Sequence, residues 1–156
     1  MKVKIKRLRP DAVIPRYAKN GDAGFDLTAV SRDFDGKGNI VYGTGLAFEI
    51  PEGYVGLVFP RSSIADKELA LTNAVGVVDS GYRGEVTAKF KPMSCFYSTV
   101  NHSTALSVAD NAHIVYNVGE RIAQMIILPY PRIEFDEVSE LSQTERGTGG
   151  YGSSGK

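Results

Sequence analysis

Apolar residues recur at every second position over several short stretches of this chain. Val3 and Ile5 alternate with lysines. Three further sets each share one face of an extended chain: Leu46, Phe48 and Ile50; Val55, Leu57 and Phe59; and Val86, Ala88 and Phe90. Such alternation is the pattern of half-buried β-strands. Residues 122–128 are apolar except for Gln124, which is typical of a strand covered on both faces.

Turn-forming residues separate these stretches. The 156 residues include 17 glycines and 7 prolines, and turns are predicted at residues 51–53 and at Ser80-Gly81. Only residues 62–69 have a helical pattern, roughly two turns long, with Ser62 as a candidate cap. Many short strands with turns between them predict an all-β fold, a sandwich, jelly roll or barrel.

The length of the chain fits one domain with a substantial core. Residues 93–112 are polar and irregular, which predicts a long excursion between strands. From Ser142 onward the sequence becomes polar and then glycine-rich. We therefore expect a β-domain over residues 1–141 and a flexible arm over residues 142–156.

Charge and cysteine content narrow the cellular setting. The chain has 18 basic and 18 acidic residues, so no net charge favours nucleic acid or membrane surfaces as partners. The start lacks the apolar run of a signal peptide, and no segment approaches membrane-spanning length. Cys95 is the only cysteine. We expect a reducing compartment, the cytoplasm, or the host cytoplasm if the source is viral.

The C-terminal residues 146–156 are the first candidate for chemistry. Glycines leave backbone N–H groups free to surround an anion, and arginine, lysine and serine add donors. Residues 150–156 match part of a phosphate-binding P-loop, but the required helix does not follow. A disordered glycine/serine tail is the alternative. Tyr151, surrounded by glycines, is placed where a base could stack.

The segment Pro60-Arg61-Ser62-Ser63 lies between a predicted strand and a predicted helix. Unpaired N–H groups at a helix start, together with an arginine and two hydroxyls, suit a phosphate group. An ordinary serine cap beside a solvated arginine is the alternative.

Residues 73–84 predict a hairpin, with a tight turn at Ser80-Gly81 and a returning strand from Glu85. Asp79, at the end of an apolar run, could be a base that activates water. It could equally be a turn aspartate bonded to its own backbone, which is the commoner role. His102 and His113 lack metal-ligand spacing and are interpreted as structural or solvated.

Five segments, taken in order, resemble the five motifs of trimeric dUTPases. They are residues 22–27 (DAGFDL), 60–65 (PRSSIA), 76–84 (GVVDSGYRG), 119–124 (GERIAQ) and 146–155 (RGTGGYGSSG). The resemblance implies a jelly-roll-like β-fold that forms a homotrimer with an exchanged C-terminal arm. It implies hydrolysis of dUTP to dUMP and pyrophosphate with Mg²⁺, which supplies dUMP and keeps uracil out of DNA.

The same resemblance implies roles for individual residues. Asp79 would deprotonate the water that attacks the α-phosphorus, and Tyr82 would pack on the deoxyribose. Mg²⁺ would sit on the phosphates and on water, with Asp26 reaching it only through water. Asn73 and the backbone of Val77, Val78 and Asp79 would hold uracil, and Tyr151 would stack on it. The expected phosphate-binding residues are Arg61, Ser62, Ser63 and Gln124, with Arg146, Ser153 and Ser154 at the γ-phosphate. Gly76, Thr87 and Gly152 are further expected substrate-binding residues.

Two departures and two rivals accompany the resemblance. Tyr151 stands where the family usually has phenylalanine, and the excursion at residues 93–112 is longer than usual. The related dCTP deaminases share the fold, but the position of their catalytic glutamate is Lys89 here, a cation that cannot accept a proton at neutral pH. A nucleotide-binding regulatory module without turnover would be expected to lose Asp79 or the arm, and both are present.

Overall fold

The computed structural model describes residues 1–93 and 115–150, and the described chain is almost entirely β-structure. It contains one short 3-10 helix, η1 (Ser62–Asp66). Its strands are β1 (Lys4–Arg7), β2 (Phe25–Thr28), β3 (Ser31–Phe34), β4 (Ile40–Gly43), β5 (Leu46–Glu49), β6 (Tyr54–Pro60), β7 (Leu69–Leu71), β8 (Gly76–Val78), β9 (Thr87–Pro92) and β10 (Arg121–Pro129). The all-β prediction is therefore confirmed.

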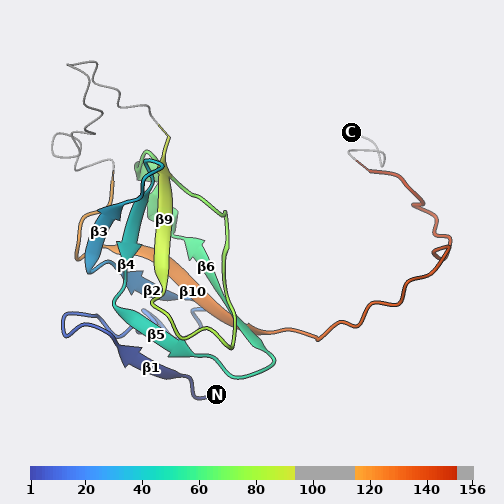
Figure 1. The fold of residues 1–156 in the computed structure, drawn as a ribbon, viewed down its shortest axis with the longest axis horizontal. Coiled ribbons are helices and arrows are strands. Elements are labelled where there is room, and N and C mark those ends of the chain that lie inside the picture. The colour runs from blue at the N-terminus through green and yellow to red at the C-terminus, as the bar shows by residue number, and fades with distance from the viewer. Residues whose placement is uncertain (94–114, 151–156) are drawn as a thin grey trace.

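The strands form two four-stranded sheets and one two-stranded sheet (Figure 1). The strand orders are β2-β10-β6-β8, β3-β4-β9-β7 and β1-β5, and every pairing is antiparallel. Inward side chains from all three sheets belong to one core cluster, in which Tyr42, Phe90 and Leu27 are among the largest fully buried residues. Sheets that share a core in this way make a jelly-roll-like sandwich.

The alternation in the sequence matches the buried faces of two strands. Leu46, Phe48 and Ile50 are all buried, as is the set Val86, Ala88 and Phe90. In β6, the face that was predicted from Val55, Leu57 and Phe59 is only half-buried, and the core side is formed by Gly56 and Val58. Strand β10 is buried at Ile122, Ala123 and Met125, but Leu128 is 43% exposed. The sequence predicted that β10 is buried on both faces, and within one chain this is true only of its first half.

Two local predictions are wrong. The helix ends at Asp66 instead of continuing to Leu69, which begins β7, and Arg61 rather than Ser62 holds the cap position, with no side-chain cap bond. A turn does close at Ser80-Gly81, where the Tyr82 N–H donates to the Asp79 carbonyl at 3.1 Å. Its flanking strands do not form a hairpin, because β8 pairs with β6 and β9 pairs with β4 and β7.

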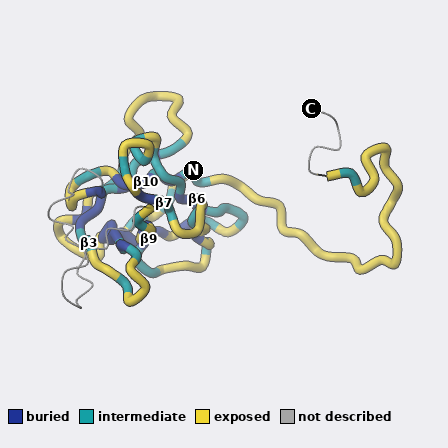
Figure 2. The backbone as a smooth tube through the Cα atoms, turned by 90° about the horizontal axis from the view of Figure 1, so that it is seen from above, coloured by how far each residue is buried: buried dark blue, intermediate teal, exposed yellow. Residues whose placement is uncertain are grey.

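The chain beyond β10 leaves the sandwich as an extended arm. Residues 128–148 are all exposed, and Figure 2 shows this segment running away from the body of the molecule. In the described residues, no helix is long and apolar enough to cross a membrane.

Candidate active site

One cluster of charged side chains lies where β2, β6 and β10 run side by side. The Arg61 Nε donates to Asp26 Oδ1 at 2.6 Å, and Arg121 donates to Asp26 Oδ2 at 2.9 Å. A second Arg61 nitrogen donates to the Ser63 hydroxyl at 3.2 Å. One carboxylate thus holds two guanidinium groups in place, and the cluster keeps an excess positive charge that suits a polyanion.

Gln124 borders this cluster from the middle strand of the three. It is paired with Asp26 on β2 and with Phe59 on β6. Its amide donates to the Pro60 carbonyl at 3.0 Å, which fixes the side chain beside the start of η1. Ser62 is exposed at the same place. The expected phosphate-binding residues are therefore brought together by one strand junction.

Asp79 follows β8 and begins the tight turn at Ser80-Gly81. The turn is closed by its own backbone and by the Arg83 guanidinium, which donates to the Ser80 carbonyl at 2.6 Å and the Tyr82 carbonyl at 2.9 Å. In residues 1–93 and 115–150 the exposed Asp79 carboxylate has no hydrogen bond of its own. The turn does not use that carboxylate, so the group is available to a water molecule or a ligand.

The Tyr82 ring is folded back over Gly84. Its hydroxyl donates to the Glu85 carbonyl at 3.0 Å, and a Cβ built at Gly84 would lie 2.6 Å from the ring atom Cζ. Glu85 is itself anchored, since its carboxylate accepts the Gly45 N–H at 2.6 Å. The ring is therefore held in one place although 46% of the residue is exposed.

The residues expected around uracil lie on and before β8. Asn73 is exposed, and Ala74 beside it has φ +56°, a conformation that residues with side chains rarely adopt. Gly76 lies close against β6, because a Cβ there would be 3.1 Å from the Cβ of Val58. Val77 is 62% exposed while Val78 is buried. Thr87 begins β9 and is exposed.

The two groups of residues lie at opposite ends of β6. Strand β8 runs antiparallel to β6, with Val78 opposite Gly56, so Asp79 leaves near the start of β6. Arg61 follows the other end of that strand. Gly56 and Arg61 are five positions apart along an extended chain, a span of about 17 Å. One chain therefore does not bring Asp79 to the Arg61 cluster.

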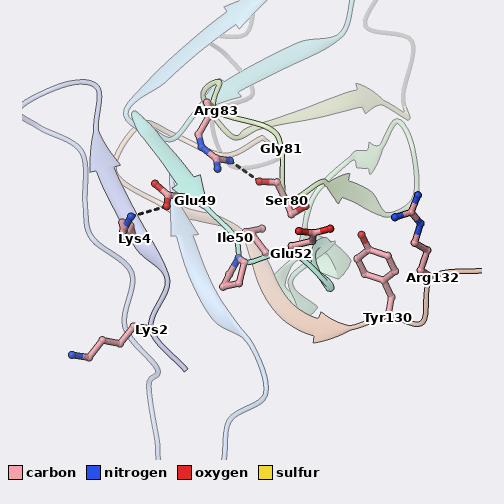
Figure 3. Close-up of a pocket in the computed structure, with 11 residues that line it drawn as sticks. Lys2, Lys4, Glu49, Ile50, Glu52, Ser80, Gly81, Arg83, Tyr130 and Arg132 are labelled. Atoms are coloured by element: carbon pink, nitrogen blue, oxygen red, sulfur yellow. Dashed lines mark hydrogen bonds and ion pairs between the residues drawn. The ribbon is translucent and has the colours of Figure 1, made fainter.

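A cavity of about 510 Å³ lies beside the Ser80-Gly81 turn (Figure 3). Its charged wall combines four cationic side chains with two acidic ones: Lys2, Lys4, Arg83, Arg132, Glu49 and Glu52. Lys4 and Glu49 form an ion pair at 2.7 Å. Tyr130, where the arm departs, lines the same cavity.

The structure describes the arm only as far as residue 150. Arg146 is exposed and its Nε donates to the Gly149 carbonyl at 3.0 Å. Tyr151, Gly152, Ser153 and Ser154 lie outside the described residues. Asp26, Arg61, Ser63 and Gln124 form what we call the phosphate-side cluster. Two residues that contact it, Arg121 and Tyr116, were not predicted from the sequence. Arg121 stood within a recognised motif, whereas no pattern pointed to Tyr116.

The carboxylate of Asp26 is the group that the sequence predicts to face a magnesium ion through water. In residues 1–93 and 115–150, no group of three or more His, Cys, Asp or Glu residues could hold a metal ion. Asp26 already accepts from two arginines, but each carboxylate oxygen keeps a second lone pair. Asp26 is therefore able to accept a further hydrogen bond, such as one from a metal-bound water.

Comparisons with known proteins agree on one family. A family model described as dUTPase matches residues 11–104 and 101–155. The deoxyuridine 5'-triphosphate nucleotidohydrolase of Nautilia profundicola is 42% identical, over 100% of this chain and 100% of that protein. The protein of the same description from Rhodococcus erythropolis is 40% identical, over 99% of this chain and 87% of that one.

Solved structures extend the comparison. A mutant of the Staphylococcus bacteriophage 80alpha dUTPase with dUpNHpp has a TM-score of 0.80 and 27% identity, covering 99% of both chains. A mutant dUTPase from phage phi11 of S. aureus, described with a structural Mg(II) ion, has a TM-score of 0.71 and 26% identity, covering 90% of this chain and 98% of that one. With a matching family model and close relatives over its whole length, this chain belongs to the dUTPase family.

Proposed function

We propose that this chain hydrolyses dUTP to dUMP and pyrophosphate as a homotrimer, in active sites shared between subunits. Family membership supports the reaction. The position of Asp79 supports the sharing. A general base must lie within hydrogen-bond reach, about 2.6–3.2 Å, of the water that it activates, directly or through one further water. Asp79 and Arg61 lie at opposite ends of β6, so a second copy must bring the base to the phosphates.

Each group then has one task. Asp79 accepts the proton of the water that attacks the α-phosphorus, and the pyrophosphate leaves on the opposite side. Arg61, Ser62, Ser63 and Gln124 donate to phosphate oxygens and bind the substrate, and the Arg61 guanidinium also stabilises the charge that develops during the attack. Asn73 and the backbone of residues 77–79 hold the uracil edge, while the Tyr82 ring packs on the deoxyribose. A 2′-hydroxyl would collide with that ring.

Mg²⁺, when bound with the substrate, would neutralise phosphate charge and help to align the three phosphates. Asp26 would hold this ion only through water, which agrees with its two arginine partners. The chain therefore contributes hydrogen-bond donors that orient the substrate and a base that activates water. It contributes no covalent nucleophile.

The composition of the extended segment after β10, residues 131–145, supports its exchange between subunits. Residues 131–145 include five acidic side chains and one basic one. Four large apolar side chains of this segment are exposed, with Phe135 at 92% and Leu141 at 87%. Burial of these side chains against another subunit would remove apolar surface from water and so favour the exchange. The first nine residues carry five basic side chains and no acidic one, so the N-terminal strand of a neighbour has the complementary charge.

In this proposal, Arg146, Tyr151, Gly152, Ser153 and Ser154 close a site of the neighbouring subunits. Arg146 and the two serines would bind the γ-phosphate, and Tyr151 would stack on uracil. Within the extended chain that follows β10, residues 142–156 are the part proposed to close the neighbouring site. A cytoplasmic location belongs to the same proposal. The single cysteine, Cys95, agrees with a reducing compartment.

The rival functions find no support in the described residues. Lys89, at the position of the deaminase glutamate, is paired with Asp35 at 3.1 Å and ties β9 to the β3–β4 turn. The Asp79 carboxylate takes no part in the hydrogen bonds of its turn. A purely regulatory module would not require such a free carboxylate.

Pyrophosphate release from single nucleotides tests the proposal. The protein is incubated with Mg²⁺ and with dUTP, dTTP, dCTP or UTP in turn. We expect dUTP to be turned over far faster than the other three. Comparable kcat/KM for UTP and dUTP would remove the role of Tyr82, and no release from dUTP would refute the proposed reaction.

A further inference from the structure

Behind the phosphate-side cluster lies a buried tyrosine that the proposed mechanism does not use. Tyr116 is only 2% exposed, and its ring packs edge-on against Tyr42 and tilted against Phe90. The Lys67 ammonium lies 5.2 Å from the centre of the ring. The backbone is held as well, because the Tyr42 hydroxyl donates to the Tyr116 carbonyl at 2.8 Å. The side chain therefore has one fixed position.

The hydroxyl at the end of this ring meets the Ser63 hydroxyl at 3.2 Å. Ser63 also accepts a hydrogen bond from Arg61 at 3.2 Å. A serine hydroxyl has two lone pairs and one proton. The Arg61 N–H occupies one lone pair, and a phenol, as the stronger acid, donates to the other in preference to an aliphatic alcohol.

Both lone pairs of Ser63 are then taken, so that Ser63 can make further hydrogen bonds only as a donor. A phosphate oxygen is an acceptor with no proton to offer. We propose that Tyr116 is a positioning residue that orients the Ser63 hydroxyl as a dedicated donor to a phosphate oxygen of the substrate. This inference rests on the proposed phosphate-binding role of Ser63.

Burial also raises the pKa of the Tyr116 phenol, which keeps the group protonated and able to donate at neutral pH. The preference for the neutral form agrees with a donor role.

Tyr116→Phe tests the inference, because it removes the hydroxyl and keeps the ring in the core. The KM for dUTP should rise by roughly two- to tenfold, the effect of losing one hydrogen bond, with kcat nearly unchanged. Thr44→Val is the control. It removes a fully buried hydroxyl that donates to the Val86 carbonyl at 2.7 Å and has no hydrogen bond to Tyr116 or Ser63. Equal KM changes in the two variants would reduce Tyr116 to a packing role.

A double-mutant cycle with Ser63→Ala separates this inference from the proposed function. In the Ser63→Ala background, Tyr116→Phe should change kcat/KM by less than about 1.5-fold, since the hydroxyl has no partner left to orient. A full additional loss would contradict the inference. If Ser63→Ala alone leaves turnover unchanged, the proposed phosphate role of Ser63 fails instead. If Ser63→Ala lowers kcat/KM and Tyr116→Phe does not, only the role of Tyr116 fails.

A second variant covers the case in which Tyr116→Phe folds poorly. A fluorotyrosine introduced at position 116 keeps the hydroxyl and makes it a stronger donor. We expect a KM for dUTP equal to or below that of the unmodified protein at neutral pH. A KM higher than that of the unmodified protein would overturn the proposed direction of the hydrogen bond.

Discussion

A methyl group added at Gly84 tests whether the position of the Tyr82 ring determines turnover. A Cβ at Gly84 would lie 2.6 Å from Cζ and 2.9 Å from Cε2 of the ring. Carbon atoms in contact are about 3.5–4.0 Å apart, so the ring must retreat by about 1 Å. The hydrogen bond from Tyr82 to the Glu85 carbonyl would break, at a cost of about 1 kcal/mol of stability. A displacement of 1 Å in a positioning group can lower a rate by ~10²-fold.

We therefore expect Gly84→Ala to lower kcat/KM for dUTP by about 10- to 100-fold and to weaken discrimination against UTP. The melting temperature should fall by only a few degrees, since about 1 kcal/mol is lost. The assay is pyrophosphate release with dUTP and with UTP. Gly81→Ala is the control in the same turn, because a Cβ there meets nothing within 4 Å. Equal kinetics for the two variants would refute the argument that Tyr82 is held in place for catalysis.

Three further predictions concern single residues. Asp79→Asn should lower kcat by at least ~10²-fold and leave binding of a non-hydrolysable dUTP analogue nearly unchanged, as measured by calorimetry; near-normal turnover would make Asp79 a turn residue. Asp26→Asn should raise the Mg²⁺ concentration needed for half-maximal turnover, because a neutral amide accepts a hydrogen bond from a metal-bound water more weakly than a carboxylate does; an unchanged Mg²⁺ titration would contradict the water-mediated contact. Burial raises the pKa of Tyr42 to about 12, so the folded chain keeps a proton that the unfolded chain loses near pH ~10. Stability should thus be fully present below about pH 10 and fall as the pH rises toward 12, and Tyr42→Phe should flatten that fall in thermal melts.

Local patterns predicted which residues share a face, but not always which face is buried. Val55, Leu57 and Phe59 do lie on one side of β6, yet Val58 and Gly56 point into the core. Both sides of this strand are apolar, and a period of two does not distinguish them. The prediction of a hairpin was wrong because a turn does not determine which strands pair. Turn chemistry at Ser80-Gly81 is local, whereas the pairing of β9 with β4 depends on residues far away in the sequence.

The resemblance to dUTPase motifs named most of the proposed site, but not its contacts. The carboxylate of Asp26 and the guanidinium of Arg121 are 95 positions apart in sequence, and Tyr116 is 53 positions from Ser63. Such pairs follow from the order of strands in the sheets, which no short motif encodes. The separation of Asp79 from Arg61 likewise required the register of β8 on β6.

Mixed trimers test the shared site most directly. Asp79→Asn trimers should be nearly inactive because every site lacks its base, and trimers truncated after Glu145 should be nearly inactive because every site lacks the closing arm. The two variants are unfolded together in equal amounts and refolded, and mixed trimers are verified by mass or by tag pull-down. If base and arm reach one site from different chains, random assortment makes about one site in four complete, so activity should return to about a quarter of the unmodified level. If mixed trimers form and activity stays at the level of the parent variants, base and arm come from the same chain or the arm has no catalytic role, and the account of a shared site is wrong.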